Sequence, residues 1–235
     1  GVDMVIHAAA LKRVERSADD IMEFVKTNVY GTMNVINACH NRGIWKLIAL
    51  SSDKAVSSVT PYGATKALVE WYAIAGNVYG GRTRSACVRY GNVLGSRGCV
   101  LETWQRQYEA GQPLTITDER MTRFWLPIED AVELALLAIQ RTGGGEIFIP
   151  KTVERGRVID LARQYYPDAR LKVTGSRAYE KLHESLVSPD EVERLRDAGD
   201  VYILLPHPKT VRWAPGPYGT EFPSVTVDFQ YRSDG

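Results

Sequence analysis

The chain has 235 residues, of which 44% are hydrophobic and 24% charged, a composition typical of a globular protein and not of a disordered one. Its 29 basic and 28 acidic side chains leave a formal net charge of +1, so no overall field attracts nucleic acid or a membrane surface. Three cysteines without metal-ligand spacing and no long apolar run lead us to expect a cytoplasmic protein without a metal site.

The first part of the chain alternates apolar strands with helical patterns. The predicted elements, in order, are a strand over 2–7, a helix over 20–43, a strand over 45–50, a helix over 61–78, a strand over 86–90 and a helix over 100–110. Strands and helices that alternate in this way form parallel βαβ units. The sequence therefore predicts an α/β fold with a Rossmann-like, doubly wound parallel sheet.

The rhythm loosens after Gly91. Two short strands and two helices are predicted between Pro- and Gly-containing loops, over 114–117, 128–141, 146–149 and 158–165. We assign residues 1–95 to the dinucleotide-binding domain and 96–235 mainly to a smaller α+β lobe for the substrate. The helix over 128–141 is expected to pack back on the sheet, and the segment after Pro206 to form an extended tail, packed on the body or partly mobile.

The strongest local signal joins a strand end to a helix start. The apolar strand ends in Ser51-Ser-Asp-Lys54, and the carboxyl ends of strands in open α/β sheets bind ligands. Tyr62 and Lys66 follow, four residues apart on one helix face. A nearby ammonium should lower the pKa of Tyr62 from about 10 toward neutrality and make it a base. The alternative is a chance surface pair, which the position after this strand disfavours.

Eight segments, in order up to about Leu205, closely resemble the inverting UDP-N-acetylglucosamine 4,6-dehydratases, in the polysaccharide-biosynthesis branch of the extended short-chain dehydrogenases. They are His7-Ala-Ala-Ala-Leu-Lys12, Lys26-Thr-Asn28, Ser52-Asp-Lys54, Tyr62-Gly-Ala-Thr-Lys66, Arg89-Tyr-Gly-Asn-Val93, Gly95-Ser-Arg-Gly98, Met121-Thr-Arg-Phe-Trp125 and Glu180-Lys-Leu-His-Glu184.

The resemblance implies an NAD(P)-dependent lyase that uses NADP or NAD. Tyr62 takes the proton of the sugar 4-hydroxyl as hydride leaves carbon 4, and Lys66 orients the cofactor ribose. Lys54 removes the carbon-5 proton and Asp53 protonates the departing 6-hydroxyl. Hydride returns to carbon 6, and a proton reaches carbon 5 from the opposite face. The Asp53-Lys54 pair indicates inversion, because retaining relatives carry Asp-Glu and epimerases small residues there.

A base at Lys54 must be uncharged, which requires burial or a neighbouring cation such as Lys66. An ionised Asp53 opposes this, so we expect the two side chains to share a proton. The alternative is an exposed Asp-Lys pair that caps a turn.

Cofactor contacts implied by the resemblance are His7, Ala8, Ala9, Tyr62, Lys66, Tyr90 and Asn92. The glycine-rich phosphate turn of dinucleotide-binding folds is absent near the start, and the glycines from Gly91 to Gly98 lie too far along to serve. We therefore expect the first βαβ unit to be missing from this chain, which leaves NADP and NAD undistinguished.

Substrate contacts implied by the resemblance are Lys12, Asn92, Arg97, Arg123, Arg177, Glu180 and His183. Arginines suit a UDP-sugar diphosphate through paired hydrogen bonds. The family's Arg-Pro-Gly-Glu-Lys reads Arg177-Ala-Tyr-Glu-Lys181 here, which should change that loop. We expect a homo-oligomer that makes a 4-keto-6-deoxy sugar for surface polysaccharide or flagellin glycans. An epimerase or reductase on the same scaffold, and a catalytically silent nucleotide-sugar binder, are the alternatives.

Overall fold

One six-stranded sheet forms the main body of the protein, with the strand order β1-β2-β3-β7-β11-β10. The computed structural model describes residues 1–235 except 80, 178, 208–221 and 227–228. The first four strands in this order are parallel, and β11 and β10 are each antiparallel to the preceding neighbour. The strands are β1 (Met4–His7), β2 (Lys46–Leu50), β3 (Arg84–Val88), β7 (Ile147–Pro150), β10 (Leu195–Asp197) and β11 (Val201–Leu204).

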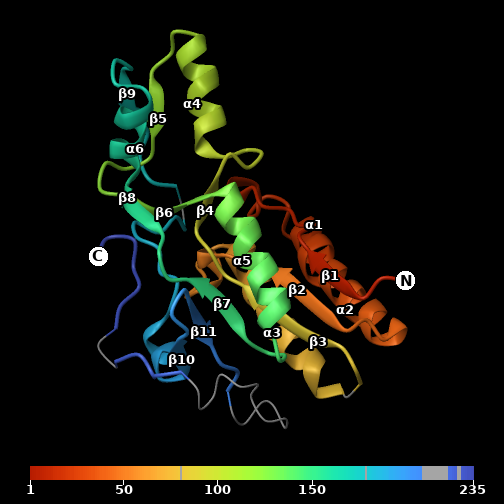
Figure 1. Cartoon of the computed structure of the whole chain (residues 1–235). Helices are drawn as coiled ribbons and strands as arrows, with labels where there is room; N and C mark the ends of the chain where they lie inside the picture. Colours follow the sequence, from red (N-terminus) through yellow and green to blue (C-terminus); the bar gives the residue numbers. More distant parts are fainter. Residues whose placement is uncertain (80, 178, 208–221, 227–228) are drawn as a thin grey trace.

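The predicted α/β class with a parallel, Rossmann-like sheet is confirmed. Helices cover both faces of the sheet, with α2 and α3 on one face and α5 on the other (Figure 1). The expectation that the first βαβ unit of the fold is missing from this chain stays a prediction. The helical segments of this body are η1 (Val14–Arg16), α1 (Ile21–Phe24), the π-helical η2 (Val25–Tyr30), α2 (Gly31–Arg42), α3 (Pro61–Gly76), η4 (Asn77–Tyr79) and α5 (Ile128–Arg141).

Strand β2 shows why both faces need a helical cover. Successive side chains of a strand point to opposite faces, and every residue from Leu47 to Ala49 is fully buried. Leu47 and Ala49 pack in one cluster with Ile36 of α2, whereas Ile48 packs in the other with Leu134 of α5. Burial of an aliphatic side chain of this size contributes about 1.5–3 kcal/mol. The continuous apolar run of β2 is thus explained by a two-sided core.

The start of helix α3 is fixed by a capping residue and packs against the turn that follows β2. Thr60 caps the helix, since its hydroxyl accepts a hydrogen bond of 3.0 Å from the backbone N–H of Gly63, and Pro61 occupies the first turn. A Cβ atom at Gly63 would overlap the carbonyl oxygen of Lys54. Glycine at this position therefore lets α3 rest directly on the backbone that follows β2.

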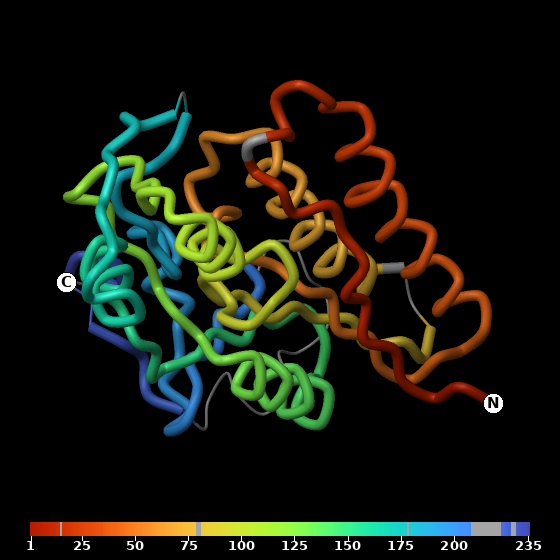
Figure 2. Tube along the Cα trace, turned by 90° about the horizontal axis from the view of Figure 1, so that it is seen from above, coloured from red at the N-terminus to blue at the C-terminus, as the bar shows by residue number. Residues whose placement is uncertain are grey.

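A smaller lobe lies beyond one end of the sheet, on the side away from the N-terminal helices (Figures 1 and 2). Its two small sheets have the orders β4-β6-β8 and β5-β9, and its core includes the fully buried Trp104. This agrees with the predicted α+β character, although only β5, α4 and α6 were foreseen as elements. The lobe contains β4 (Asn92–Leu94), α4 (Val100–Glu109), β5 (Leu114–Ile116), β6 (Thr122–Pro127), β8 (Glu154–Arg157), α6 (Val158–Tyr165) and β9 (Leu171–Val173).

Residues after 95 contribute to both parts of the molecule. They supply β7, β10, β11 and α5 to the main body as well as the strands of the lobe, so a domain boundary at residue 95 stays a prediction. The predicted tail falls partly on 208–221 and 227–228, outside the described residues. Within its described part, the Tyr231 hydroxyl donates a 2.7 Å hydrogen bond to the carbonyl of Pro150 at the end of β7. That part of the tail is packed on the body.

The described segments contain no helix that is both long and apolar enough to cross a bilayer.

Candidate active site

The short turn after β2 holds a fully buried carboxylate. The 3-10 turn η3 (Asp53–Ala55) starts after Ser52, whose hydroxyl donates a 2.8 Å hydrogen bond to Oδ1 of Asp53. The backbone N–H of Asp53 donates to the carbonyl of Tyr90 at 2.9 Å, which ties this turn to the end of β3. Oδ2 of Asp53 is buried and forms no hydrogen bond within the described part of the chain. A carboxylate oxygen in this state is costly unless a ligand or a proton satisfies it.

Tyr62, in the first turn of α3, belongs to the same site as Asp53. Burial raises the pKa of Tyr62, the negative charge of Asp53 raises it further, and a side-chain hydrogen bond with Ser52 opposes both effects. Ser52 therefore contacts both the carboxylate and the phenol. Ser52 stands within the quoted Ser52-Asp-Lys54 segment but was not among the predicted site residues.

Lys66 is anchored at the end of β2, and its role toward the cofactor stays a prediction. Its ammonium donates a 2.7 Å hydrogen bond to the carbonyl of Leu50, the last residue of β2. Burial lowers the pKa of Lys66 to about 8. Burial and the negative charge of Asp53 move the pKa of Tyr62 upward instead. The prediction that Lys66 lowers the pKa of Tyr62 is therefore wrong for this structure. The positive charge of Lys66 does contribute, after burial, to a lowered pKa of His7.

Lys54 reaches three oxygen atoms from three parts of the chain. Its Nζ atom lies 3.0 Å from Oδ1 of Asp53, 3.3 Å from Oδ1 of Asn92 and 3.7 Å from Oε1 of Glu184. The Lys54 side chain is 18% exposed, and that of Asp53 is 0% exposed. The alternative of a solvent-exposed turn pair is contradicted by these values. Glu184 ends a segment quoted for the resemblance, but it carried no predicted role.

The candidate cofactor contacts lie along one edge of the sheet. His7 ends β1, and its Nε2 atom lies 3.0 Å from the hydroxyl of Thr32; Ala8 and Ala9 follow and are exposed. Tyr90 follows β3, and burial together with nearby Tyr62 raises the pKa of Tyr90 to about 12. Because β1, β2 and β3 are adjacent and parallel, their carboxyl ends bring these residues to the edge where Asp53 lies.

The predicted substrate residues fall into two groups. Lys12 donates a 3.0 Å hydrogen bond to Ser96, and Arg97 and Arg177 are exposed. Arg123, in contrast, is only 6% exposed. The exposed arginines keep their guanidinium groups available to a diphosphate, and their role stays a prediction.

The side chains of Arg123, Glu180 and His183 already contact other parts of the chain. The Arg123 guanidinium donates to the carbonyls of Thr122 at 2.7 Å and Leu182 at 3.2 Å, and it lies 3.5 Å from Oε1 of Glu180. The His183 ring is 2.9 Å from the hydroxyl of Thr122. Arg123, Glu180 and His183 therefore hold the lobe's loops together in this structure, and a contact to substrate stays a prediction for them.

The loop in which the chain departs from the resembled family has an unusual backbone. Tyr179, which stands where that family has glycine, adopts a φ of 65°, in the left-handed region. A residue with a side chain is uncommon there, because its Cβ crowds the backbone. This chain thus places a tyrosine in a backbone conformation that glycine adopts more readily.

A buried ion network, missed by sequence analysis, supports the strand end from the other side. Arg89 donates to both oxygens of Glu70 at 2.8 and 2.7 Å and to both of Glu191 at 2.9 and 2.8 Å. Ser51 donates a 2.6 Å hydrogen bond to Glu70. Glu191 comes from the 3-10 helix η5 (Pro189–Arg194). The network joins α3, β3 and η5 next to the residues that begin the site.

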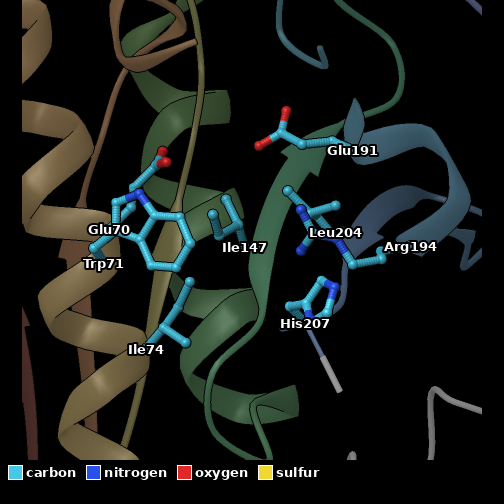
Figure 3. A pocket seen from close by; sticks show the side chains of 8 residues that line it. All are labelled: Glu70, Trp71, Ile74, Ile147, Glu191, Arg194, Leu204 and His207. Atoms are coloured by element: carbon cyan, nitrogen blue, oxygen red, sulfur yellow. The ribbon is translucent and has the colours of Figure 1, made fainter. Parts of the chain in front are cut away.

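Glu70 and Glu191 also line a small pocket between α3 and η5 (Figure 3). Its volume is about 60 Å³, which is room for about two water molecules and too little for a nucleotide sugar. A second pocket of about 310 Å³ lies beside β7 and β11 and is lined in part by Tyr202 and Tyr231. Neither pocket is lined by a predicted site residue. Within the described residues, no group of three or more His, Cys, Asp and Glu side chains is placed to hold a metal ion.

Comparison with known proteins decides the family. A family model described as "Polysaccharide biosynthesis protein" matches residues 1–206. The chain belongs to this polysaccharide biosynthesis protein family. The predicted resemblance to its dehydratase branch is supported by a relative from Campylobacter jejuni serotype O:2, named UDP-N-acetylglucosamine 4,6-dehydratase (inverting). That protein is 42% identical over 240 residues, which are 99% of this chain and 72% of the relative.

Other relatives carry a different name. A Rickettsia massiliae protein named UDP-glucose 4-epimerase is 41% identical over 212 residues, covering 87% of this chain and 61% of its own length. Among solved structures, Pen from Bacillus thuringiensis is similar with a TM-score of 0.85 and 32% identity, covering 99% of this chain and 70% of that one. The family and the fold are therefore established, and the reaction has to be argued from the site.

Proposed function

We propose that the protein is a nucleotide-sugar 4,6-dehydratase that acts on UDP-N-acetylglucosamine with inversion at carbon 5. The observation that carries the proposal is the position of Lys54 beside Asp53, with Tyr62 linked to the same carboxylate through Ser52. Dehydration needs a base for carbon 5 and an acid for the 6-hydroxyl around one sugar ring. A 4-epimerase needs neither, so an amine and a buried carboxylate at this point favour the dehydratase over the 4-epimerase.

The three side chains can supply the required protonation states. Transfer of a proton from the Tyr62 phenol through the Ser52 hydroxyl to Asp53 leaves a phenolate and a carboxylic acid. The phenolate then takes the proton of the 4-hydroxyl, and the acid gives its proton to the departing 6-hydroxyl, which leaves as water. The neutral Lys54 amine takes the carbon-5 proton and becomes an ammonium. Each proton that is taken up or released in the oxidation and in the loss of water thus has a named group within the site.

A nicotinamide dinucleotide, NADP or NAD, would supply the hydride acceptor and donor when bound. The residues at the carboxyl ends of β1 and β3 fit such a group, because Ala8 and Ala9 are exposed and small and Tyr90 lies close to Tyr62. We propose His7, Ala8, Ala9, Tyr62, Lys66, Tyr90 and Asn92 as the residues that hold it. Lys66 is fixed on the Leu50 carbonyl by a 2.7 Å hydrogen bond, so its ammonium is available at a defined place.

For the UDP-sugar we propose Lys12, Asn92, Arg97 and Arg177 as direct contacts, because Asn92 contacts Lys54 and the other three side chains are exposed. The product would enter surface polysaccharide or flagellin glycan synthesis in the cytoplasm. Exposed apolar side chains on the outer face of α3, Leu68 at 50% and Trp71 at 60%, favour a homo-oligomer that covers them.

The test is turnover of UDP-N-acetylglucosamine by the full-length protein in heavy water with added NADP or NAD. We expect a 4-keto-6-deoxy sugar that carries deuterium at carbon 5. Recovery of the substrate or its carbon-4 epimer with the 6-hydroxyl intact would contradict the dehydratase. Calorimetric binding of the UDP-sugar without any product would instead support a catalytically silent binder.

A further inference from the structure

Glu184 is a buried carboxylate that has no role in the proposed dehydration. Its side chain is 4% exposed; Oε1 lies 3.7 Å from Nζ of Lys54, and Oε2 lies 3.3 Å from Nζ of Lys181. Oε2 forms no hydrogen bond within the described residues. A carboxylate taken out of water loses several kcal/mol of solvation unless cations compensate. The two lysines are those cations.

The loop that carries Glu184 is held by contacts that do not involve its carboxylate. Its backbone N–H donates to the Ser233 hydroxyl at 2.9 Å, and its carbonyl accepts from the Ser233 N–H at 2.9 Å. Lys181 donates a 2.5 Å hydrogen bond to the carbonyl of Val56, two residues after Lys54. Glu184 is thus placed against Lys54 by its surroundings, and the pairing is not a chance orientation of a free side chain.

The charges around Lys54 come from two elements. Asp53, in η3, and Glu184, in the loop before η5, face its amine, while Asn92 contributes an uncharged oxygen. Lys54 and Lys181 are the charged groups that face Glu184, and Tyr62 lies close enough to Asp53 for that carboxylate to raise its pKa. When Asp53 carries the proton destined for the 6-hydroxyl, it no longer balances an ammonium. Glu184 is then the negative charge that remains beside Lys54.

We propose that Glu184 is a positioning residue for Lys54: it holds the amine beside Asp53 and stabilises the ammonium that forms when the carbon-5 proton is taken. In that step the bond from carbon 5 to hydrogen breaks, a nitrogen–hydrogen bond forms, and the electron pair left on carbon 5 expels the 6-hydroxyl as Asp53 protonates it. The proposal rests on the dehydratase function proposed above.

The protonation of Lys54 can be measured without turnover. Brief labelling of the full-length protein with acetic anhydride between about pH 6 and pH 10, followed by peptide mass spectrometry, gives the pH midpoint of Lys54 reactivity. Glu184→Gln removes a negative charge that favours the ammonium, so the midpoint should fall by about one pH unit or more. Lys181→Met removes a competing cation and should raise it. Asp200→Asn, which changes a surface pair with Arg141, should leave it unchanged.

An unchanged midpoint in Glu184→Gln overturns the proposal whatever the enzyme catalyses. If Glu184→Gln fails to fold, Lys181→Met, which keeps Glu184, tests the proposal. A raised midpoint of Lys54 reactivity in that variant supports the proposal, and an unchanged midpoint contradicts it.

Kinetics with UDP-N-acetylglucosamine then separate the two proposals. In Glu184→Gln we expect kcat to fall at least about tenfold with little change in KM, the acidic limb of the pH profile to move to lower pH, and Glu184→Asp to recover part of the rate. Normal kcat with an unchanged pH profile in Glu184→Gln overturns the positioning role. If the wild-type protein shows no turnover but Glu184→Gln shifts the labelling midpoint, the dehydratase function is contradicted and the charge pairing between Glu184 and Lys54 still holds.

Discussion

The Nζ atom of Lys54 lies 3.0 Å from Oδ1 of Asp53, so two consecutive residues bring an amine and a buried carboxylate to one point. This closeness lets a proton be shared between them, and it is the arrangement on which the proposed chemistry depends.

Replacing Asp53 by asparagine should slow both chemical steps. An amide keeps the shape but has no acidic proton, so dehydration should slow by about 10²–10⁴-fold. Removal of hydride from carbon 4 should slow as well, because the amide cannot take up the Tyr62 proton and the phenolate is not formed. The check is product analysis together with the absorbance of reduced nicotinamide, which should not accumulate in Asp53→Asn. Full turnover in this variant would remove Asp53 from the mechanism.

Lys66 makes stability depend on pH in a predictable direction. Burial lowers its pKa to about 8 from an ordinary 10.5, so between these values the unfolded chain binds the proton and the folded chain does not. Wild-type stability should therefore rise with pH through this window, relative to Lys66→Met, which cannot titrate there. The gain is on the order of 2 kcal/mol between pH 7 and pH 10. Urea unfolding of both proteins at the two pH values measures the difference; a constant difference would show that Lys66 titrates normally.

The Arg89 network should be costly to break. Removing one partner of a buried ion pair leaves an uncompensated charge, so Arg89→Leu should lower the free energy of unfolding by about 3–5 kcal/mol. Arg157→Ala, which removes an exposed pair with Asp160, is the matched control and should leave the urea midpoint nearly unchanged. Equal effects of the two changes would mean that the network adds no more than a surface pair.

Gly63 offers a test of how closely α3 rests on the turn that carries Lys54. Helix propensity alone predicts that Gly63→Ala is stabilising by about 1 kcal/mol. The added Cβ would overlap the Lys54 carbonyl and lie 3.0 Å from Cβ of Ser58, so we expect a loss of about 1–3 kcal/mol and of activity. Gly156→Ala, where no atom lies within 4 Å, serves as the control in thermal unfolding and turnover assays. A more stable, active Gly63→Ala would refute the close approach.

Regular elements with strong local signals were predictable. The helices over 128–141 and 158–165 have the predicted bounds, because each combines an apolar stripe with acidic residues in its first turn. Strands β4, β6 and β8 were missed, since they are short and their pairing partners are remote in sequence. β6, for example, pairs Thr122 with Arg157 in β8 and Trp125 with Asn92 in β4. Local pattern carries no information on such partners.

Site residues divide in the same way. Asp53, Lys54 and Tyr62 could be named because they lie within one short stretch, at a strand end and a helix start. Glu184 and the network partners of Arg89, which lie 19 and 102 residues away from it, could not. The direction of the Tyr62 pKa also escaped prediction, because it depends on burial and on Asp53 and not on the spacing to Lys66.

The π-helical segment η2 makes the long N-terminal helix intolerant of a change in residue number. Asn28 within it donates 2.9 and 3.0 Å hydrogen bonds to the Leu11 carbonyl and the Thr65 hydroxyl, and it accepts a 2.8 Å bond from the Leu11 N–H. One residue added to or removed from this wide turn would rotate Asn28 by about 100°, the angular step of an α-helix. The loop after β1 would then lose its tie to α3, even though every catalytic side chain stayed in the sequence.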